Sequence, residues 1–189
     1  MVFLIIAAVV VLAALGWVVY VFNSLVKLRA LCRNAWSDIE IQLRRRHNLV
    51  PNLVETVKGY MAHERTTLEE VTRARARATE ARTVAERGEN EQALSAALRQ
   101  LFALAESYPE LKASANFLEL QAALVEIENT IQQARRYYNA VVRDYNIRRQ
   151  VFPASLVAGA FGFGPLEYFA AEEEDREPVA VTFAPGGEQ

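Results

Sequence analysis

The feature that most constrains this chain is an uncharged apolar segment near its N-terminus, residues 2–22. Its 21 residues, folded as an α-helix, span about 30 Å, which is the thickness of the hydrocarbon core of a bilayer. Trp17 and Tyr20 lie near its inner end, at the depth where aromatic side chains gather at membrane interfaces. The segment therefore predicts a single transmembrane helix, with residues 1–23 as a membrane anchor.

Two other interpretations of this segment fit less well. A cleaved signal peptide needs a basic start and a shorter apolar core. Here no Lys or Arg precedes Lys27, and the apolar run continues as far as Phe22. A buried core helix would need equally apolar partners, which the rest of the sequence lacks.

The charges around the anchor predict its direction. No charged side chain precedes the segment, whereas six basic residues follow it: Lys27, Arg29, Arg33, Arg44, Arg45 and Arg46. Positive flanks stay on the cytoplasmic side of a membrane. We therefore expect a single-pass protein of the cell membrane, with its N-terminus outside and its body in the cytoplasm.

The body, residues 24–150, shows the periodicity of helices and no alternation typical of strands. Two apolar stripes carry spacings of three and four residues, as in helical bundles and coiled coils. The first is interrupted at Arg46 and His47 and contains Leu25, Leu28, Cys32, Ala35, Ile39, Leu43, Val50, Leu53, Val57 and Tyr60. The second contains Phe117, Leu120, Leu124, Ile127, Ile131, Ala134, Tyr138, Val141 and Tyr145.

Glycine and proline divide the body into four helical segments. We expect Gly88 to end a helix over 63–87 and Pro109 to end one over 91–108, before a last helix over 110–150. Short connections favour antiparallel neighbours. The fold class is therefore all-α: a transmembrane helix followed by an antiparallel four-helix bundle with long first and last helices.

The apolar segment 151–170 follows the last helix. Because an even number of helices returns the chain to the end where it began, this segment is expected near the membrane. Its prolines and glycines make it too broken to span the bilayer. It is either an interfacial or docking element, or a cover along the base of the bundle. Its candidate contact residues are Phe152, Leu156, Phe161, Phe163 and Phe169.

Charge is unevenly distributed along the chain. Residues from Val151 onward carry −6, which leaves +4 on residues 1–150 of the total −2. Such a mildly basic body lacks the dense positive surface of a nucleic-acid-binding protein. Residues 171–189 are predicted to form an acidic flexible tail, in which residues 179–183 alternate like a short strand.

The residues that carry chemistry are few. His63-Glu64 begins a zinc-protease motif, but Thr67 stands where its second histidine belongs. The sequence contains no Glu-x-x-His pair, Gly-rich phosphate loop or Cys-x-x-Cys. Cys32 is the only cysteine, and we interpret it as a small core residue, with lipidation as the alternative. We expect no catalytic residue, no cofactor and no metal site.

The run Arg44-Arg45-Arg46 is the most distinctive polar motif of the body. Three consecutive residues fan around a helix, so at least one should face the seam and pair with acids on the last helix. The others are candidate contacts for a partner. Direct lipid contact is disfavoured, because a straight helix places them roughly 30 Å from the membrane.

Several stretches resemble the LemA family. They are residues 22–29, 34–60, 63–75, 108–121, 127–146 and 152–169, in that order along the chain. The resemblance implies a bacterial or archaeal single-pass protein with an antiparallel, mostly four-helix soluble body. It implies no defined biochemical role.

Together these features predict a non-enzymatic scaffold or adaptor anchored in the membrane, which self-associates or docks membrane partners. The expected partners are the lipid bilayer, further copies of the chain and a possible membrane protein, but not nucleic acid. The alternative, regulation of a membrane protease or of envelope quality control, rests on the family resemblance alone.

Overall fold

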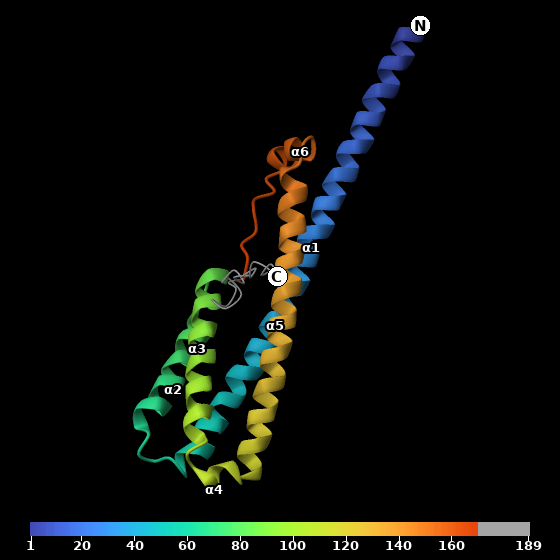
Figure 1. Ribbon diagram of the computed structural model, residues 1–189. Helices are drawn as coiled ribbons and strands as arrows, with labels where there is room; N and C mark the ends of the chain where they lie inside the picture. Colours follow the sequence, from blue (N-terminus) through green and yellow to red (C-terminus); the bar gives the residue numbers. More distant parts are fainter. Residues whose placement is uncertain (170–189) are drawn as a thin grey trace, which may run out of the picture.

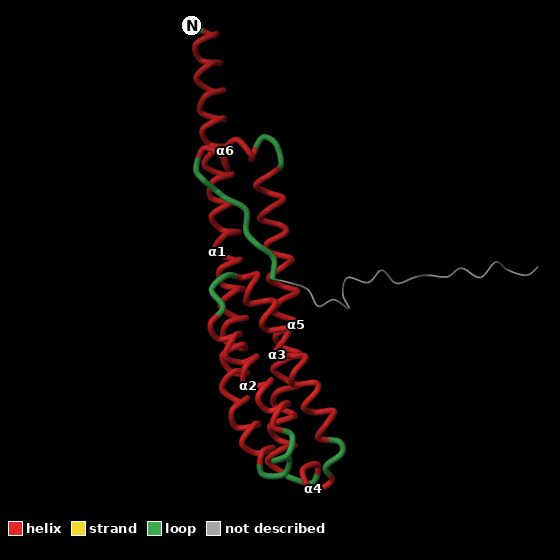
Figure 2. The backbone as a smooth tube through the Cα atoms, turned by 90° about the vertical axis from the view of Figure 1, so that its left-hand side faces the viewer, coloured by secondary structure: helices red, strands yellow, loops and turns green. Residues whose placement is uncertain are grey.

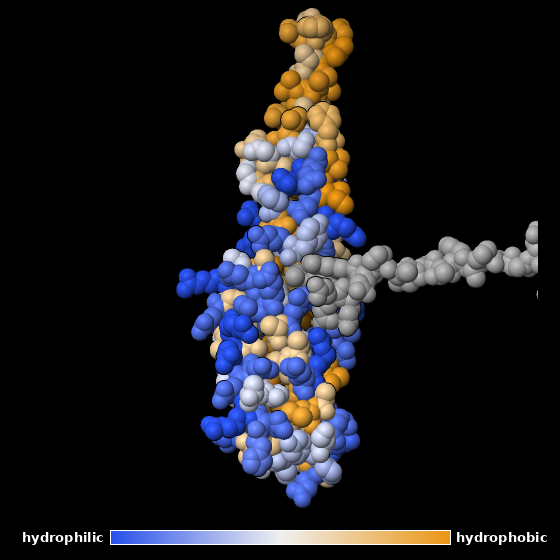
Figure 3. All heavy atoms as spheres, turned by 60° about the vertical axis from the view of Figure 1, so that its left-hand side comes forward, coloured by the Kyte–Doolittle hydropathy of each residue, from blue (hydrophilic) through white to orange (hydrophobic). Residues whose placement is uncertain are grey.

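One continuous helix forms the spine of the protein. The computed structural model describes residues 1–169, and α1 extends from Val2 to Lys58 as a single helix of 57 residues. Its N-terminal part is long and apolar enough to cross a membrane and is not covered by the rest of the chain. Figure 1 shows this part projecting beyond all other elements, and Figure 3 shows apolar residues gathered over it. The expected anchor and the body therefore share one helix, without a break at residue 23.

Helices α2 (Arg65–Glu80) and α3 (Val84–Ala105) form a hairpin against the membrane-distal part of α1. The prediction that Gly88 ends a helix is wrong, because Gly88 is buried inside α3. The break lies earlier, where Thr83 begins α3 with a capping box: its hydroxyl accepts from the Glu86 N–H while the Glu86 carboxylate accepts from the Thr83 N–H.

The chain then returns toward the membrane. The short helix α4 (Pro109–Lys112) precedes α5 (Ala115–Gln150), so the helix expected over 110–150 is interrupted at residues 113–114. Helix α5 runs antiparallel to α1 along the whole soluble length of α1 (Figures 1 and 2). Its last turn reaches the level of Tyr20, over whose ring the Arg148 guanidinium lies.

The membrane-proximal end is completed by α6 (Ala154–Ala160) and by residues 161–169, which we call the strap: a turn at residues 161–162 followed by a segment without regular secondary structure. Figure 2 shows the strap turning back along α5 and α1. The predicted all-α class with long first and last helices is thus confirmed. The predicted acidic tail, including residues 179–183, lies outside the described residues.

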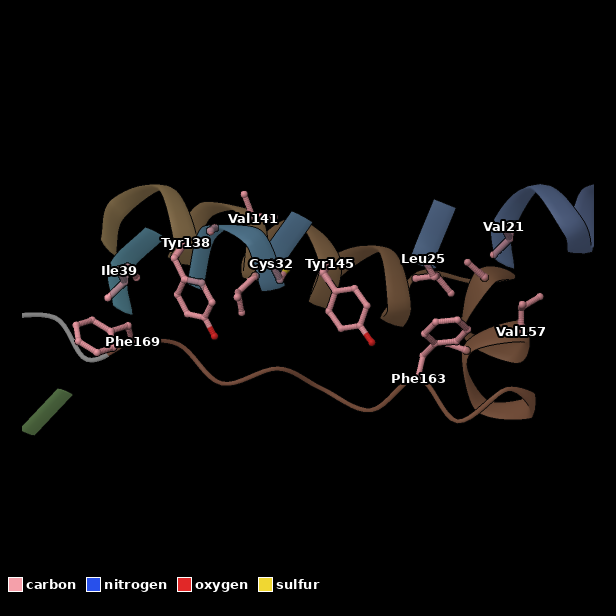
Figure 4. Packing of buried hydrophobic residues seen from close by; sticks show 14 of the residues in the cluster. Val21, Leu25, Cys32, Ile39, Tyr138, Val141, Tyr145, Val157, Phe163 and Phe169 are labelled. Atoms are coloured by element: carbon pink, nitrogen blue, oxygen red, sulfur yellow. The ribbon is translucent and has the colours of Figure 1, made fainter. Parts of the chain in front are cut away.

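Two apolar clusters fill the interior, one on each side of a charged layer. The membrane-distal cluster joins α1 and α5 to the α2–α3 hairpin around residues such as Leu53 and Leu101. The membrane-proximal cluster joins α1 and α5 to α6 and the strap, and it contains Cys32. Figure 4 shows residues of this second cluster, with Phe163 and Phe169 turned in from the strap.

Candidate functional site

A cluster of buried charged residues separates the two apolar clusters. At its centre, Arg46 occupies the seam position at which the apolar stripe of α1 is interrupted, and it is only 1% exposed. It donates from Nη1 to Ser95 Oγ at 2.9 Å, and it pairs with the carboxylates of Glu91 on α3 and Glu128 on α5. One side chain of α1 therefore connects three helices.

The residue after Arg46 extends this cluster. His47 Nε2 is 2.7 Å from Glu91 Oε1, and the backbone oxygen of His47 accepts a hydrogen bond from Arg75 Nε at 2.7 Å. Burial raises the pKa of Glu91, but the hydrogen bond with His47 and the charge of Arg46 outweigh it and hold that pKa below the ordinary range. Glu91 is thus held ionised by its neighbours.

The cluster has the character of a structural device rather than a reaction centre. Both carboxylates are taken up by Arg46 or His47, and no group of three or more metal-ligating side chains occurs among the described residues. The other histidine, His63, is exposed. Burial raises the pKa of the Cys32 thiol, which leaves it protonated and unreactive at neutral pH.

The three arginines predicted as candidate contacts, residues 44–46, differ in their exposure. Arg44 and Arg45 are exposed and remain available to a partner. Arg46 is not available, which corrects its assignment as a contact residue and agrees with the expectation that one member of the run pairs with an acid on the last helix. The signal for the cluster was present in the sequence, since the spacing of the α1 stripe from Leu43 to Val50 is regular if Arg46 is counted.

A second arrangement joins the strap to α5 through a repeated Tyr-Asn dyad. The Asn139 side chain accepts from the Phe169 N–H at 2.9 Å and donates to the Phe169 carbonyl at 3.0 Å. Asn146 makes the same two bonds with Leu166, at 3.1 and 2.9 Å. The dyads form hydrogen bonds only with main-chain groups of the strap. They therefore fix the backbone conformation of the strap and do not select its side chains.

The tyrosines of the dyads complete this ladder. The Tyr138 hydroxyl donates to the Glu167 carbonyl and the Tyr145 hydroxyl to the Gly164 carbonyl, each at 2.9 Å. Figure 4 shows both hydroxyls pointing to the strap. Burial raises the pKa of Tyr138 to about 12, so it remains a donor at neutral pH.

The spacing of the dyads explains why the ladder fits. Seven helical residues separate the dyads and advance about 10.5 Å. Three extended residues separate the strap groups that they bind and advance about 10 Å. This match was not predicted from the sequence, although two Tyr-Asn pairs at a spacing of seven are visible in residues 138–146.

The large apolar residues of the C-terminal segment separate into two groups. Phe163 and Phe169 are 7% and 3% exposed, so their assignment as contact residues is wrong: they pack inside the chain, Phe163 against Phe22 and Phe169 against Trp36. Phe152, Leu156 and Phe161 are 75%, 65% and 56% exposed. We call these three the apolar ridge.

A groove of about 800 Å³ lies between α1 and α2 at the membrane-distal end. Apolar residues such as Val54 and Leu68 line it together with charged residues of both signs, among them Lys58 and Glu69. Its lining contains no histidine or cysteine. The groove therefore offers a surface for contact, and the one hydroxyl in its lining, that of Thr72, donates to the Leu68 carbonyl at 2.9 Å.

A family model and two curated relatives match most of the length of this chain. The sequence model of the LemA family matches residues 35–183. Magnetosome protein MamQ 2 of Paramagnetospirillum magneticum is 24% identical over 202 residues, which cover 93% of this chain and 74% of the relative. Protein LemA of Metamycoplasma hominis is 26% identical over 161 residues, which cover 83% of this chain and 72% of the relative. Together with the apolar start of α1, these relatives support a membrane-associated protein.

Replacing Arg46 tests the buried charge cluster. Arg46→Met strands the Glu91 carboxylate in the interior, and we expect a loss of about 3–5 kcal/mol in the free energy of unfolding. Arg46→Met combined with Glu91→Leu removes Arg46 and its buried partner, leaves Glu128, which is 29% exposed, and should recover most of that loss. Thermal unfolding followed by circular dichroism in detergent measures both. Arg45→Met, at an exposed neighbour, is the control, and equal effects of Arg45→Met and Arg46→Met would refute the assignment.

The lowered pKa of Glu91 predicts acid sensitivity. A carboxyl group whose pKa is lower in the folded state stabilises the fold fully above its unfolded pKa, about 4.3 for glutamate. That stabilisation is lost as the pH falls through the folded pKa. The unfolding temperature of the wild type should therefore fall more steeply below about pH 4.3 than that of Glu91→Gln. Parallel curves for the two proteins would contradict this linkage.

Removing both amides of the ladder should release the strap. Asn139→Ala with Asn146→Ala deletes four partly buried hydrogen bonds, each worth about 1 kcal/mol. We expect hydrogen exchange of residues 163–169, measured by mass spectrometry, to accelerate at least tenfold while residues 117–131 remain protected. Asn129→Ala, at an exposed asparagine of α5, is the control. An unchanged strap would show that the ladder is dispensable.

Proposed function

The chain is a member of the LemA family, and on that premise we propose that it is a non-enzymatic, membrane-anchored scaffold that self-associates at its membrane-proximal end. In this proposal α1 crosses the bilayer with its N-terminus outside, because bases follow the apolar segment and none precedes it. The helical body then stands in the cytoplasm as a rod perpendicular to the membrane.

The observation that carries the proposal is the apolar ridge. Phe152, Leu156 and Phe161 expose large apolar side chains on and around α6, and the Phe161 ring lies 5.0 Å from that of Phe22, where the membrane-crossing part of α1 ends. Apolar clusters of this kind mark contact surfaces. Copies anchored in one membrane meet at this level, so a second copy is the partner that we assign to the ridge.

The non-enzymatic part of the proposal rests on how the polar groups of the body are used. The buried charges Arg46 and Glu91 satisfy one another, and the buried tyrosine hydroxyls bind the strap. In the distal groove the Thr72 hydroxyl is bonded to a main-chain carbonyl rather than to a carboxylate that could act as its base. Regulation of a membrane protease, the alternative from the family resemblance, has no contact or cavity in its favour among residues 1–169.

Oligomeric state tests the proposal. The full-length protein in lipid nanodiscs or mild detergent should contain more than one copy, by light scattering and by chemical crosslinking. The triple variant Phe152→Ser, Leu156→Ser, Phe161→Ser should shift to monomers, because it removes the apolar area available to a partner.

The control for this experiment uses exposed apolar residues elsewhere. Leu118→Ser with Val125→Ser alters α5 near the distal end, where both side chains are about half exposed, and should leave the number of copies unchanged. A strictly monomeric wild-type protein without a co-purifying partner would refute the scaffold.

A further inference from the structure

The membrane-proximal end of the fold carries basic side chains without acidic ones. Neither residues 1–37 nor residues 145–166 contain Asp or Glu. These stretches lie side by side, because the end of α5 reaches the level of Tyr20 (Figure 1). They contain five bases, which we call the basic collar: Lys27, Arg29, Arg33, Arg148 and Arg149.

Arg148 lies at the depth of the membrane interface. Its guanidinium carbon is 5.9 Å from the centroid of the Tyr20 ring, a cation–π arrangement. Tyr20 belongs to the last turn of the apolar segment, two residues before its end at Phe22. This contact holds a positive charge where the hydrocarbon core meets the lipid headgroups. Lys27 follows on the same face of α1, two helical turns from Tyr20.

Arg149 and Arg29 form a second pair of bases. Both lie near the Tyr145 phenol, since their charges oppose the burial that raises the pKa of Tyr145. Two positive charges close to one group repel each other unless an anion stands between them.

The protein does not supply that anion within the described part of the chain. None of the ion pairs of residues 1–169 involves a member of the basic collar. Asp144, the nearest carboxylate in sequence to Arg148, is bonded to Arg143 at 3.3 Å. The Nε atoms of Arg148 and Arg149 have no hydrogen-bond partner among these residues. These Nε atoms are buried, so the Nη groups, for which residues 1–169 supply no hydrogen-bond partner either, are the donors left for a ligand.

We propose that the basic collar binds the phosphate groups of anionic phospholipids, with Arg148 and Arg149 as the principal ligands. A guanidinium donates two parallel hydrogen bonds to a phosphate, which fits these unpaired arginines. The inference rests on the membrane anchoring in the proposed function and is independent of self-association.

The position of the collar favours a lipid over a soluble phosphate. Tyr20 fixes Arg148 at the level of the headgroups, and the apolar ridge lies at the same end of the molecule. A base on an interfacial aromatic side chain, as Arg148 lies on Tyr20, is typical of elements at the surface of anionic membranes.

Lipid retention on the full-length protein tests the site. The protein is purified in detergent with equimolar phosphatidylglycerol and phosphatidylcholine, and native mass spectrometry counts the lipids that stay bound. The wild type should prefer phosphatidylglycerol. Arg148→Gln with Arg149→Gln should lower that preference about twenty-five-fold, because each interfacial base contributes about fivefold.

Arg44→Gln with Arg45→Gln is the matched control. It removes the same charge from exposed arginines that lie roughly 30 Å further from the membrane, and it should leave the preference unchanged. Equal losses in both pairs, or no preference in the wild type, would overturn the inference. If the variant with both glutamines fails to fold, Arg148→Lys with Arg149→Lys takes its place. It keeps both charges but loses the paired N–H donors of the guanidinium. An undiminished preference for phosphatidylglycerol would then contradict the proposed ligands.

Two further outcomes separate the possible failures. Displacement of phosphatidylglycerol by millimolar glycerol phosphate would identify a site for soluble phosphates and overturn the assignment to lipid. A wild-type protein that does not fractionate with membranes would refute the anchoring itself. A protein that fractionates with membranes but retains both lipids equally would refute the collar alone.

Discussion

Arg46 has to be neutralised where it is buried, and this requirement fixes how three helices align. Its guanidinium is paired only when Glu91 of α3 and Glu128 of α5 stand opposite it. A slip of either helix would leave a charge in an apolar interior, which costs several kcal/mol. The apolar seams on both sides of this layer would allow several alignments of the helices along one another, since one aliphatic side chain can replace another in such a contact. The charged layer selects one of them.

The layer also marks a change in how the long α1–α5 pair is covered. On its distal side the α2–α3 hairpin supplies the additional apolar faces. On its proximal side no further long helix is present in the described chain, and α6 and the strap take that place. Two helices alone leave much of their apolar stripes in water, so the strap is a structural necessity there. The Tyr-Asn dyads satisfy its main-chain groups where no sheet or helix does so.

Much of this architecture could be predicted from the sequence, because apolar residues that recur every three to four positions indicate a helix. The apolar spacing of three and four residues predicts the seam residues Leu25 and Tyr145. The even number of expected helices predicts that the last helix returns to the membrane end. The pairing of Arg46 with an acid on the last helix was expected, but its partner Glu91 on α3 could not be predicted, since the start of that helix was placed after Gly88 and not at the Thr83 capping box. Phe163 and Phe152 look alike in sequence, and only the path of the strap decides which one is buried.

The continuity of α1 has a mechanical consequence. The same helix passes through the lipid and ends at the distal groove, and the 36 residues from Phe22 to Lys58 form an arm of about 54 Å. A tilt of 20°, ordinary for a single membrane-crossing helix, would carry the far end of that arm sideways by about 18 Å. If α1 crosses the bilayer as proposed, it would act as a lever whose short end follows the thickness of the bilayer. Its long end would then move by more than half the diameter of a small domain.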